Sequence, residues 1–169
     1  MLSRHEPEGN ALWQFSLAFY AAPGVADALI ALQDLDGLDV NLILFALWLG
    51  LSGYGRLDRD ALAAADRAIC NVRDETVGPL RALRRKLKNN PDPDIQRLRE
   101  GVRALELAAE KVVQSRLVCL ARPGDGSAPR DARLADAFAN FALYLGPTRV
   151  QVGEARLIRE ALEGFPGEH

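Results

Sequence analysis

The sequence predicts an all-α protein, a single-domain bundle of seven to eight helices around a buried central helix at about residues 40–49. Three observations carry this prediction. The run from Leu42 to Leu49 has no polar side chain, so a helix there has no face for solvent. Apolar residues recur elsewhere at helical spacing, and no useful length of chain alternates as a strand does. At 169 residues, 49% of them hydrophobic, the chain can bury a substantial core.

The helices are bounded by local stop and start signals. Asn10 and Asp58 can act as N-caps, and Pro23 fits the first turn of a helix. Asp39, the last residue of a short acidic turn, can cap the central helix, which we expect to end at Gly50. The predicted helices span residues 11–22, 25–35, 40–49, 58–75, 80–88, 95–121, 132–145 and 150–162.

The later helices are separated by proline- and glycine-containing breaks. Gly78-Pro79 is expected to separate the fourth helix from the fifth, and Asp94 can cap the sixth after a polar stop at 89–94. A loop at 122–130, rich in glycine and proline, is the segment expected to be most mobile. We expect one helical domain, with a flexible N-terminus and a flexible tail. These parts span residues 10–164, 1–9 and 165–169.

Charge and composition indicate a cytoplasmic protein. A formal net charge of −2 gives no global attraction to nucleic acid or anionic membrane. The central helix is too short to span a bilayer, and the polar start of the chain lacks the apolar run of a secretory signal. Cys70 and Cys119, far apart in helical contexts, are expected to be reduced and buried.

The sequence lacks the residues that most catalytic mechanisms require. Both histidines, His5 and His169, fall in terminal segments, which argues against a histidine-activated nucleophile or a zinc site using histidine. Gly53-Tyr54-Gly55 lacks the lysine and the spacing of a phosphate-binding loop. The sequence therefore names no catalytic residue, metal ligand or cofactor. It leaves open whether the protein is an enzyme, while favouring that it is not.

The acidic turn at 34–39 allows a structural or a binding role. It fails as a calcium loop, because Gly37 is fourth rather than sixth from Asp34 and Phe45 occupies the twelfth position. Capping and turn formation explain these residues, with the amide of Asn41 bonded to the turn. The alternative is a polar pocket for a small molecule or a metal, lined by Gln14, Asp34, Asp39, Asn41 and Arg56.

The fifth predicted helix carries a basic stripe beside a leucine edge. At 100° per residue, one contiguous strip comprises Arg81, Arg84, Arg85 and Lys88. A solvated face paired with nearby acids is the ordinary explanation. The functional alternatives are an acidic protein partner, RNA or a phosphorylated ligand, since arginine forks suit carboxylate and phosphate. No aromatic residues interleave, which weakens the case for single-stranded nucleic acid.

The sixth predicted helix has a heptad seam of three repeats. It comprises Ile95, Leu98, Val102, Leu105, Ala109 and Val112. Packing inside the bundle is the first interpretation of such a seam, and a homodimer through residues 95–121 is the second.

Several motifs in the first half of the chain match a known pattern. They are Trp13-Gln14-Phe15-Ser16-Leu17, Tyr20, Pro23-Gly24-Val25, Leu32-Gln33-Asp34, Gly37-Leu38-Asp39-Val40-Asn41-Leu42 and Phe45-Ala46-Leu47-Trp48-Leu49-Gly50, followed by Pro79-Leu80-Arg81 and Leu83-Arg84. With them the chain resembles, over most of residues 11–120, a proteobacterial family of small proteins of unknown function. The resemblance implies a bacterial, cytoplasmic protein and brings no activity or site residues.

Taken together, the residues favour a non-enzymatic protein that binds a protein partner through the basic stripe. A small-molecule or metal-binding protein, with its pocket near residues 33–41, is the alternative. RNA or phosphate binding through residues 80–88 is a further alternative, and no membrane role is expected.

Overall fold

The computed structural model describes residues 11–122, 124 and 127–166, and within them it contains helices and no strands. This confirms the predicted all-α class. The helices are α1 Ala11–Tyr20, α2 Val25–Asp36, α3 Val40–Leu51, α4 Arg59–Val72, the π-helical η1 Arg73–Val77, α5 Gly78–Leu87, α6 Pro93–Val118, α7 Arg130–Arg149 and α8 Gly153–Glu163.

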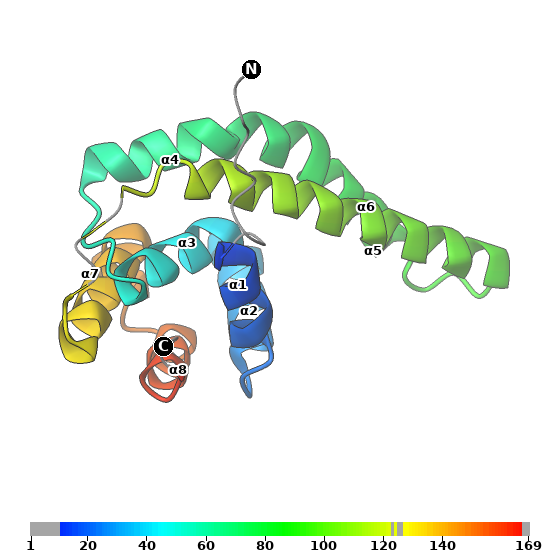
Figure 1. The fold of residues 1–169 in the computed structure, drawn as a ribbon. Coiled ribbons are helices and arrows are strands. Elements are labelled where there is room, and N and C mark those ends of the chain that lie inside the picture. Colours follow the sequence, from blue (N-terminus) through cyan, green and yellow to red (C-terminus); the bar gives the residue numbers. More distant parts are fainter. Residues whose placement is uncertain (1–10, 123, 125–126, 167–169) are drawn as a thin grey trace, which may run out of the picture.

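Helix α3 is the centre of the bundle, as predicted. All of its residues are buried, and α1, α2, α6 and α7 pack against it (Figure 1). Asp39 caps it, with its carboxylate accepting from Asn41 N at 2.8 Å. The helix does not end at Gly50, as the sequence suggested, but continues to Leu51. A Cβ on Gly50 would lie 2.2 Å from Ala137 N, so glycine is needed there for the close approach of α7.

The chain stays helical through the predicted break at Gly78-Pro79. Segment η1 leads directly from α4 into α5, and Gly78 N–H donates to the carbonyl of Arg73, five residues back. Proline is tolerated in the first turn of α5 because its missing N–H has no obligatory partner there. The π turn therefore joins two helices that the sequence separates, and it places Arg73 at their junction.

Helices α5 and α6 form a hairpin whose far end projects beyond the rest of the molecule (Figure 1). The N-cap of α6 is Asp92, which accepts from the backbone N of Asp94, so Asp94 is not the cap as predicted. The predicted heptad seam is split by the fold. Val102 and Ala109 are buried against the bundle, while the large residues of the other heptad position face outward: Leu98, Leu105 and Val112.

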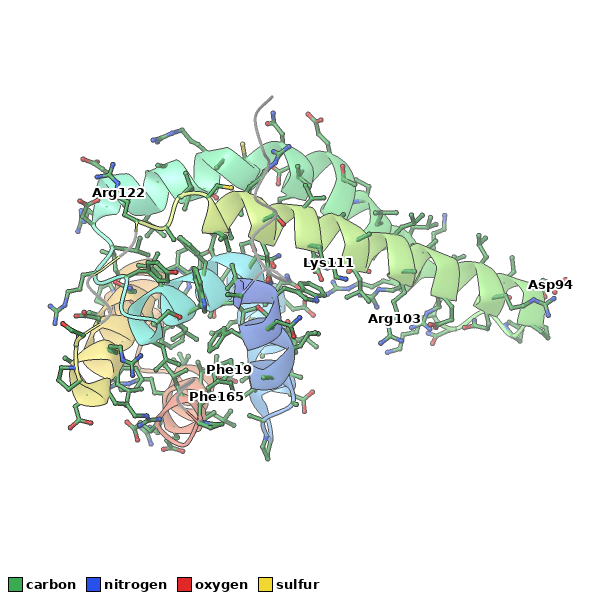
Figure 2. The ribbon with its side chains drawn as sticks, in the orientation of Figure 1. Phe19, Asp94, Arg103, Lys111, Arg122 and Phe165 are labelled. Atoms are coloured by element: carbon green, nitrogen blue, oxygen red, sulfur yellow. The ribbon has the colours of Figure 1, made fainter. Side chains whose placement is uncertain are left out.

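The C-terminal helices close the other side of α3. Helix α7 runs beyond the predicted end at residue 145, with a kink at Gly146 (φ 78°), and α8 packs against α2. Phe165, predicted to lie in a flexible tail, instead stacks edge-on against Phe15 and Phe19 with ring centroids 5.4 and 5.6 Å apart (Figure 2). The predictions for residues 1–10, 123, 125–126 and 167–169 lie outside the described part of the chain.

Two further sequence predictions can be compared with the fold. Cys70 and Cys119 are free thiols as expected, but Cys70 is half-buried and Cys119 is exposed, so the predicted burial is wrong. Within the described segments, no individual helix has the length and apolarity to cross a membrane. Helices α1 and α2 pass that test only as a pair, and they are bent by 103° at the break between them.

Candidate functional site

Two adjoining cavities open beside the N-terminus of α3, and we call them together the polar cleft. One, of about 460 Å³, lies between the α2–α3 turn and residues of α4, η1 and α7. The other, of about 420 Å³, lies between α1 and the hairpin of α5 and α6. Both are lined by Gln33, Asn41 and Arg81, so these three side chains form a shared wall. The cleft thus draws on helices that are distant in sequence.

Asp39 is the acidic group nearest the start of α3. Its Oδ2 lies 3.6 Å from Arg73 Nη1, and its backbone N–H donates to the Tyr144 hydroxyl at 2.8 Å. Burial raises the pKa of Asp39, although the Asn41 N–H and Arg73 act in the opposite direction. Arg73 is shared with Asp66 at 2.5 Å, so its charge only partly compensates Asp39.

A chain of buried amides connects three helices behind the cleft. Gln114 Nε2 on α6 donates to Asn41 Oδ1 at 3.0 Å and to the Ser16 hydroxyl at 3.1 Å. Ser16 in turn donates to the carbonyl of Leu12 on its own helix. The Asn41 amide was expected to bond to the acidic turn, but its oxygen is satisfied by α6. This network fixes α1 and α3 against α6, because buried polar groups left without partners are costly.

Two carboxylates on α6 bind the arginines of α5. Arg81 donates to Glu106 at 3.0 Å and to Glu110 at 2.6 Å, and Arg84 forms a forked contact with Glu106. Burial alone would raise the pKa of Glu106, but the two arginines hold it below its usual value. Glu110 behaves differently: burial raises its pKa, and the charges of Glu106 and Asp39 add to that effect. Glu110 and Asp39 are therefore within electrostatic reach of each other.

Two polar side chains face the cleft without a protein partner. Neither the Tyr20 hydroxyl nor the Gln33 side-chain amide is hydrogen-bonded to any residue in the described part of the chain. Burial raises the pKa of Tyr20 to about 12, and Glu110 contributes to the rise. Burial likewise raises the pKa of Tyr144 to about 12. Both phenols are therefore neutral hydrogen-bonding groups at physiological pH, available to a molecule in the cleft.

The predicted pocket residues are only partly brought together. Asp39 and Asn41 line the polar cleft. Gln14 is exposed on α1, Asp34 forms an ion pair with Arg85 at 2.7 Å, and Arg56 pairs with Asp136 at 2.7 Å. These three residues do not line the cleft. They were grouped by polarity and by nearness to the acidic turn, but the path of the chain separates them from its interior.

The basic stripe is likewise divided. Arg81 and Arg84 are partly buried in the ion pairs with α6, Arg85 is paired at the surface, and Lys88 is exposed. Pairing with nearby acids was the ordinary explanation of this stripe. The burial was not expected, because it depends on how α6 folds back along α5.

The carboxylates of the acidic turn point to different parts of the molecule. Asp34 faces α5, Asp36 pairs with Arg149 of α7 at 2.9 Å, and Asp39 caps α3. In the segments for which the structure gives positions, no three side chains of His, Cys, Asp or Glu gather closely enough to hold a metal ion.

Several cleft residues carry no signal that marks them as site residues in the local sequence. They are Tyr20, Gln33, Arg73, Glu106, Glu110, Gln114 and Tyr144. One signal beyond the local sequence existed for two of them. Glu106 and Glu110 are four apart and Arg81 and Arg84 are three apart, and either spacing puts a pair on one face of its helix, so the two pairs can meet in an antiparallel hairpin. For Tyr144, more than 100 residues from Asp39, no local signal was available.

Comparison with known proteins identifies a family. The model of the family described as "Protein of unknown function (DUF2390)" matches residues 11–117. This confirms the predicted resemblance to a family of proteins of unknown function. The matched span contains every cleft residue discussed above except Tyr144. No curated protein and no solved structure matches the chain.

Proposed function

The chain belongs to the DUF2390 family of proteins of unknown function, and from that premise and the geometry of the polar cleft we propose that it binds a small polar molecule bearing an amino or guanidino group. One observation carries the proposal. Asp39 lines one of the two adjoining cavities and Glu110 lines the other, and these partly buried carboxylates are within electrostatic reach of each other.

The cationic group follows from the charges in the cleft. Burial raises the pKa of both Asp39 and Glu110, and the nearby Arg73 and Arg81 offset the effect of burial on these two carboxylates only in part. A ligand ammonium beside either carboxylate would supply further positive charge in a partly desolvated site. The hydroxyl of Tyr20 and the amide of Gln33 offer hydrogen bonds to the remaining polar atoms of the ligand.

The proposal is binding rather than a reaction. The hydroxyl of Ser16 lines the cleft, but it donates to the carbonyl of Leu12 and accepts from Gln114, so no side chain is placed to activate it as a nucleophile. The cytoplasmic location and bacterial origin expected from the sequence are part of this proposal and rest on the sequence alone.

The test is thermal denaturation and calorimetry with three matched sets of small molecules: amines, carboxylates and phosphates. At 100 times its dissociation constant, a ligand adds about 2.7 kcal/mol to the unfolding free energy. We expect amines to raise the melting temperature of the wild-type protein. Asp39→Asn and Glu110→Gln should abolish this rise, and Asn at position 39 can still cap α3.

Gln14→Ala is the matched control, because Gln14 was a predicted pocket residue and is exposed outside the cleft. It should bind amines like the wild type. Stabilisation by carboxylates or phosphates alone, or by amines to the same extent in Asp39→Asn, would contradict the proposal, and so would no stabilisation by any set.

Binding of an acidic partner, RNA or phosphate at the basic helix stays a prediction. Any such partner must compete with the internal ion pairs of Arg81, Arg84 and Arg85, or meet the exposed Lys88. Reversing the charge of Arg85 and Lys88 leaves the cleft intact, so loss of a co-purifying partner from that variant would favour this second function.

A further inference from the structure

Helix α6 has a second apolar face, which points away from the bundle. We call it the outer face; it comprises Leu98, Gly101, Leu105, Ala108, Val112 and Ser115. The three large residues are 55%, 60% and 48% exposed. The six positions follow the alternating spacings of three and four that bring residues onto one side of a helix, and none of them carries a charge.

This face is distinct from the side of α6 that packs on the bundle. Val102, Val113 and Leu117 are buried there, and Glu106 and Glu110 point into the polar cleft. Figure 2 labels Arg103 and Lys111, and Lys111 lies over the ring of Trp13 on α1. At 100° per residue the outer face is centred on nearly the opposite side from Glu110. A helix that is apolar on two sides normally has a partner on each.

We propose that a second copy of this chain packs antiparallel along the outer face, forming a twofold symmetric dimer. In an antiparallel pair centred between Leu105 and Ala108, each large residue meets a small one. Leu98 lies opposite Ser115 of the second copy, Gly101 opposite Val112, and Leu105 opposite Ala108. The small residues let the two helix backbones approach closely, and the large ones fill the space beside them.

A parallel pair of the same faces packs poorly. Each layer would then hold two identical residues, so Leu105 would meet Leu105 while Gly101 met Gly101 and left a gap. Charged residues at the edge of the face also favour the antiparallel arrangement. Glu100 and Lys111 lie along one edge, and the antiparallel register brings Glu100 of one copy to within about 3 Å, along the axis, of the level of Lys111 of the other.

The size of the face sets the strength of the dimer. Residues 98–115 extend over about 26 Å of helix. A strip of that length and about 10 Å wide has an area well below the roughly 800 Å² that each partner buries in a standard interface. The dimer is therefore expected to be weak and to form only as the protein concentration rises. Because the outer face is opposite the cleft, dimerisation leaves both clefts open.

Sedimentation equilibrium from about 1 μM to about 500 μM tests the association. We expect the mean mass to rise from 18.5 kDa toward twice that value. Ala108→Glu and Gly101→Glu should stay monomeric over the whole range. An added Cβ at Gly101 has open space, so that variant keeps the fold, which circular dichroism verifies. Ala135→Glu, at an exposed alanine of α7, is the matched control and should dimerise like the wild type.

Disulfide trapping tests the register. In a background of Cys70→Ser and Cys119→Ser, the Gly101→Cys protein should form disulfides when mixed with the Val112→Cys protein, and neither should do so efficiently alone. Efficient self-linking of each variant would overturn the antiparallel arrangement. A wild-type protein that is monomeric at every concentration, or an association that Ala108→Glu does not weaken, would overturn the dimer.

Discussion

Replacing Gly50 by alanine puts a methyl group where the backbone of α7 already lies. An added Cβ would be 2.2 Å from Ala137 N and 2.4 Å from its Cα, whereas ordinary contact begins at 3.4 Å. Backbone atoms cannot rotate away as a side chain can. Helix α7 must therefore withdraw from α3 by about 1 Å along its closest contact, a gap that forfeits a quarter to a half of the dispersion energy there.

The expected cost follows from two opposing effects. Overpacking a close helix contact typically costs up to about 3 kcal/mol, and the better helix propensity of alanine returns about 1 kcal/mol. We therefore expect Gly50→Ala to lower the free energy of unfolding by about 2 kcal/mol. For a chain of this length the melting temperature should fall by about 4–8 °C. Urea denaturation followed by the fluorescence of Trp48, which is buried on the same helix, measures the loss.

Gly101→Ala makes the same chemical change in a helix interior where an added Cβ meets open space. It should stabilise the protein by up to about 1 kcal/mol, measured at a concentration low enough to keep the protein monomeric. Gly50→Ala should thus lower the free energy of unfolding, and Gly101→Ala should raise it. A Gly50→Ala protein as stable as the wild type, or more so, would refute the inference that α7 is seated on this glycine.

The remaining predictions concern the cleft. Glu106→Gln should cost about 2–4 kcal/mol at pH 7, because it leaves partly buried arginines without their carboxylate. The pKa of Glu106 is lowered in the folded state, so its stabilising effect is present above the unfolded pKa and is lost as the pH falls through the folded pKa. Urea titrations should therefore show the unfolding free energies of the variant and the wild type converging in acid. Asn41→Leu and Gln114→Leu should each lower the free energy of unfolding by about 1–3 kcal/mol, because each leaves the other amide without its partner. In a double-mutant cycle, the double variant should lose less than the sum of the two single variants, because neither amide is then left unpaired. Tyr144→Phe should cost about 1 kcal/mol in the same assay, because Asp39 N–H loses its acceptor; a neutral result would mean that water replaces the hydroxyl at no cost.

The helical framework was accessible from the sequence because its signals are local. An unbroken apolar run identified α3 as the central helix, and carboxylate caps at Asp39 and Asp58 marked two helix starts that the structure confirms. Glycine and proline were less informative. Gly50 looked like a helix stop and is a contact point between α3 and α7, and Gly78-Pro79 looked like a break in what is a continuous helical stretch.

The candidate site was accessible only in part. Asp39 and Asn41 were predicted because they are polar residues in or next to the acidic turn. Their partners Tyr144 and Gln114 are far along the chain, and nothing in the local pattern marks them. Glu106 and Glu110 read as exposed helix residues until α5 is folded against them.

The sequence by itself determined which segments are helices and which helix all the others must cover, since a run without polar side chains cannot face water. Only the tertiary structure decided which polar groups meet around the end of that helix, and which apolar residues of α6 remain outside. Hydrophobic burial and capping act over a few residues, so they can be recognised along the chain. The pairing of charges and amides depends on positions that are set only when distant helices pack together.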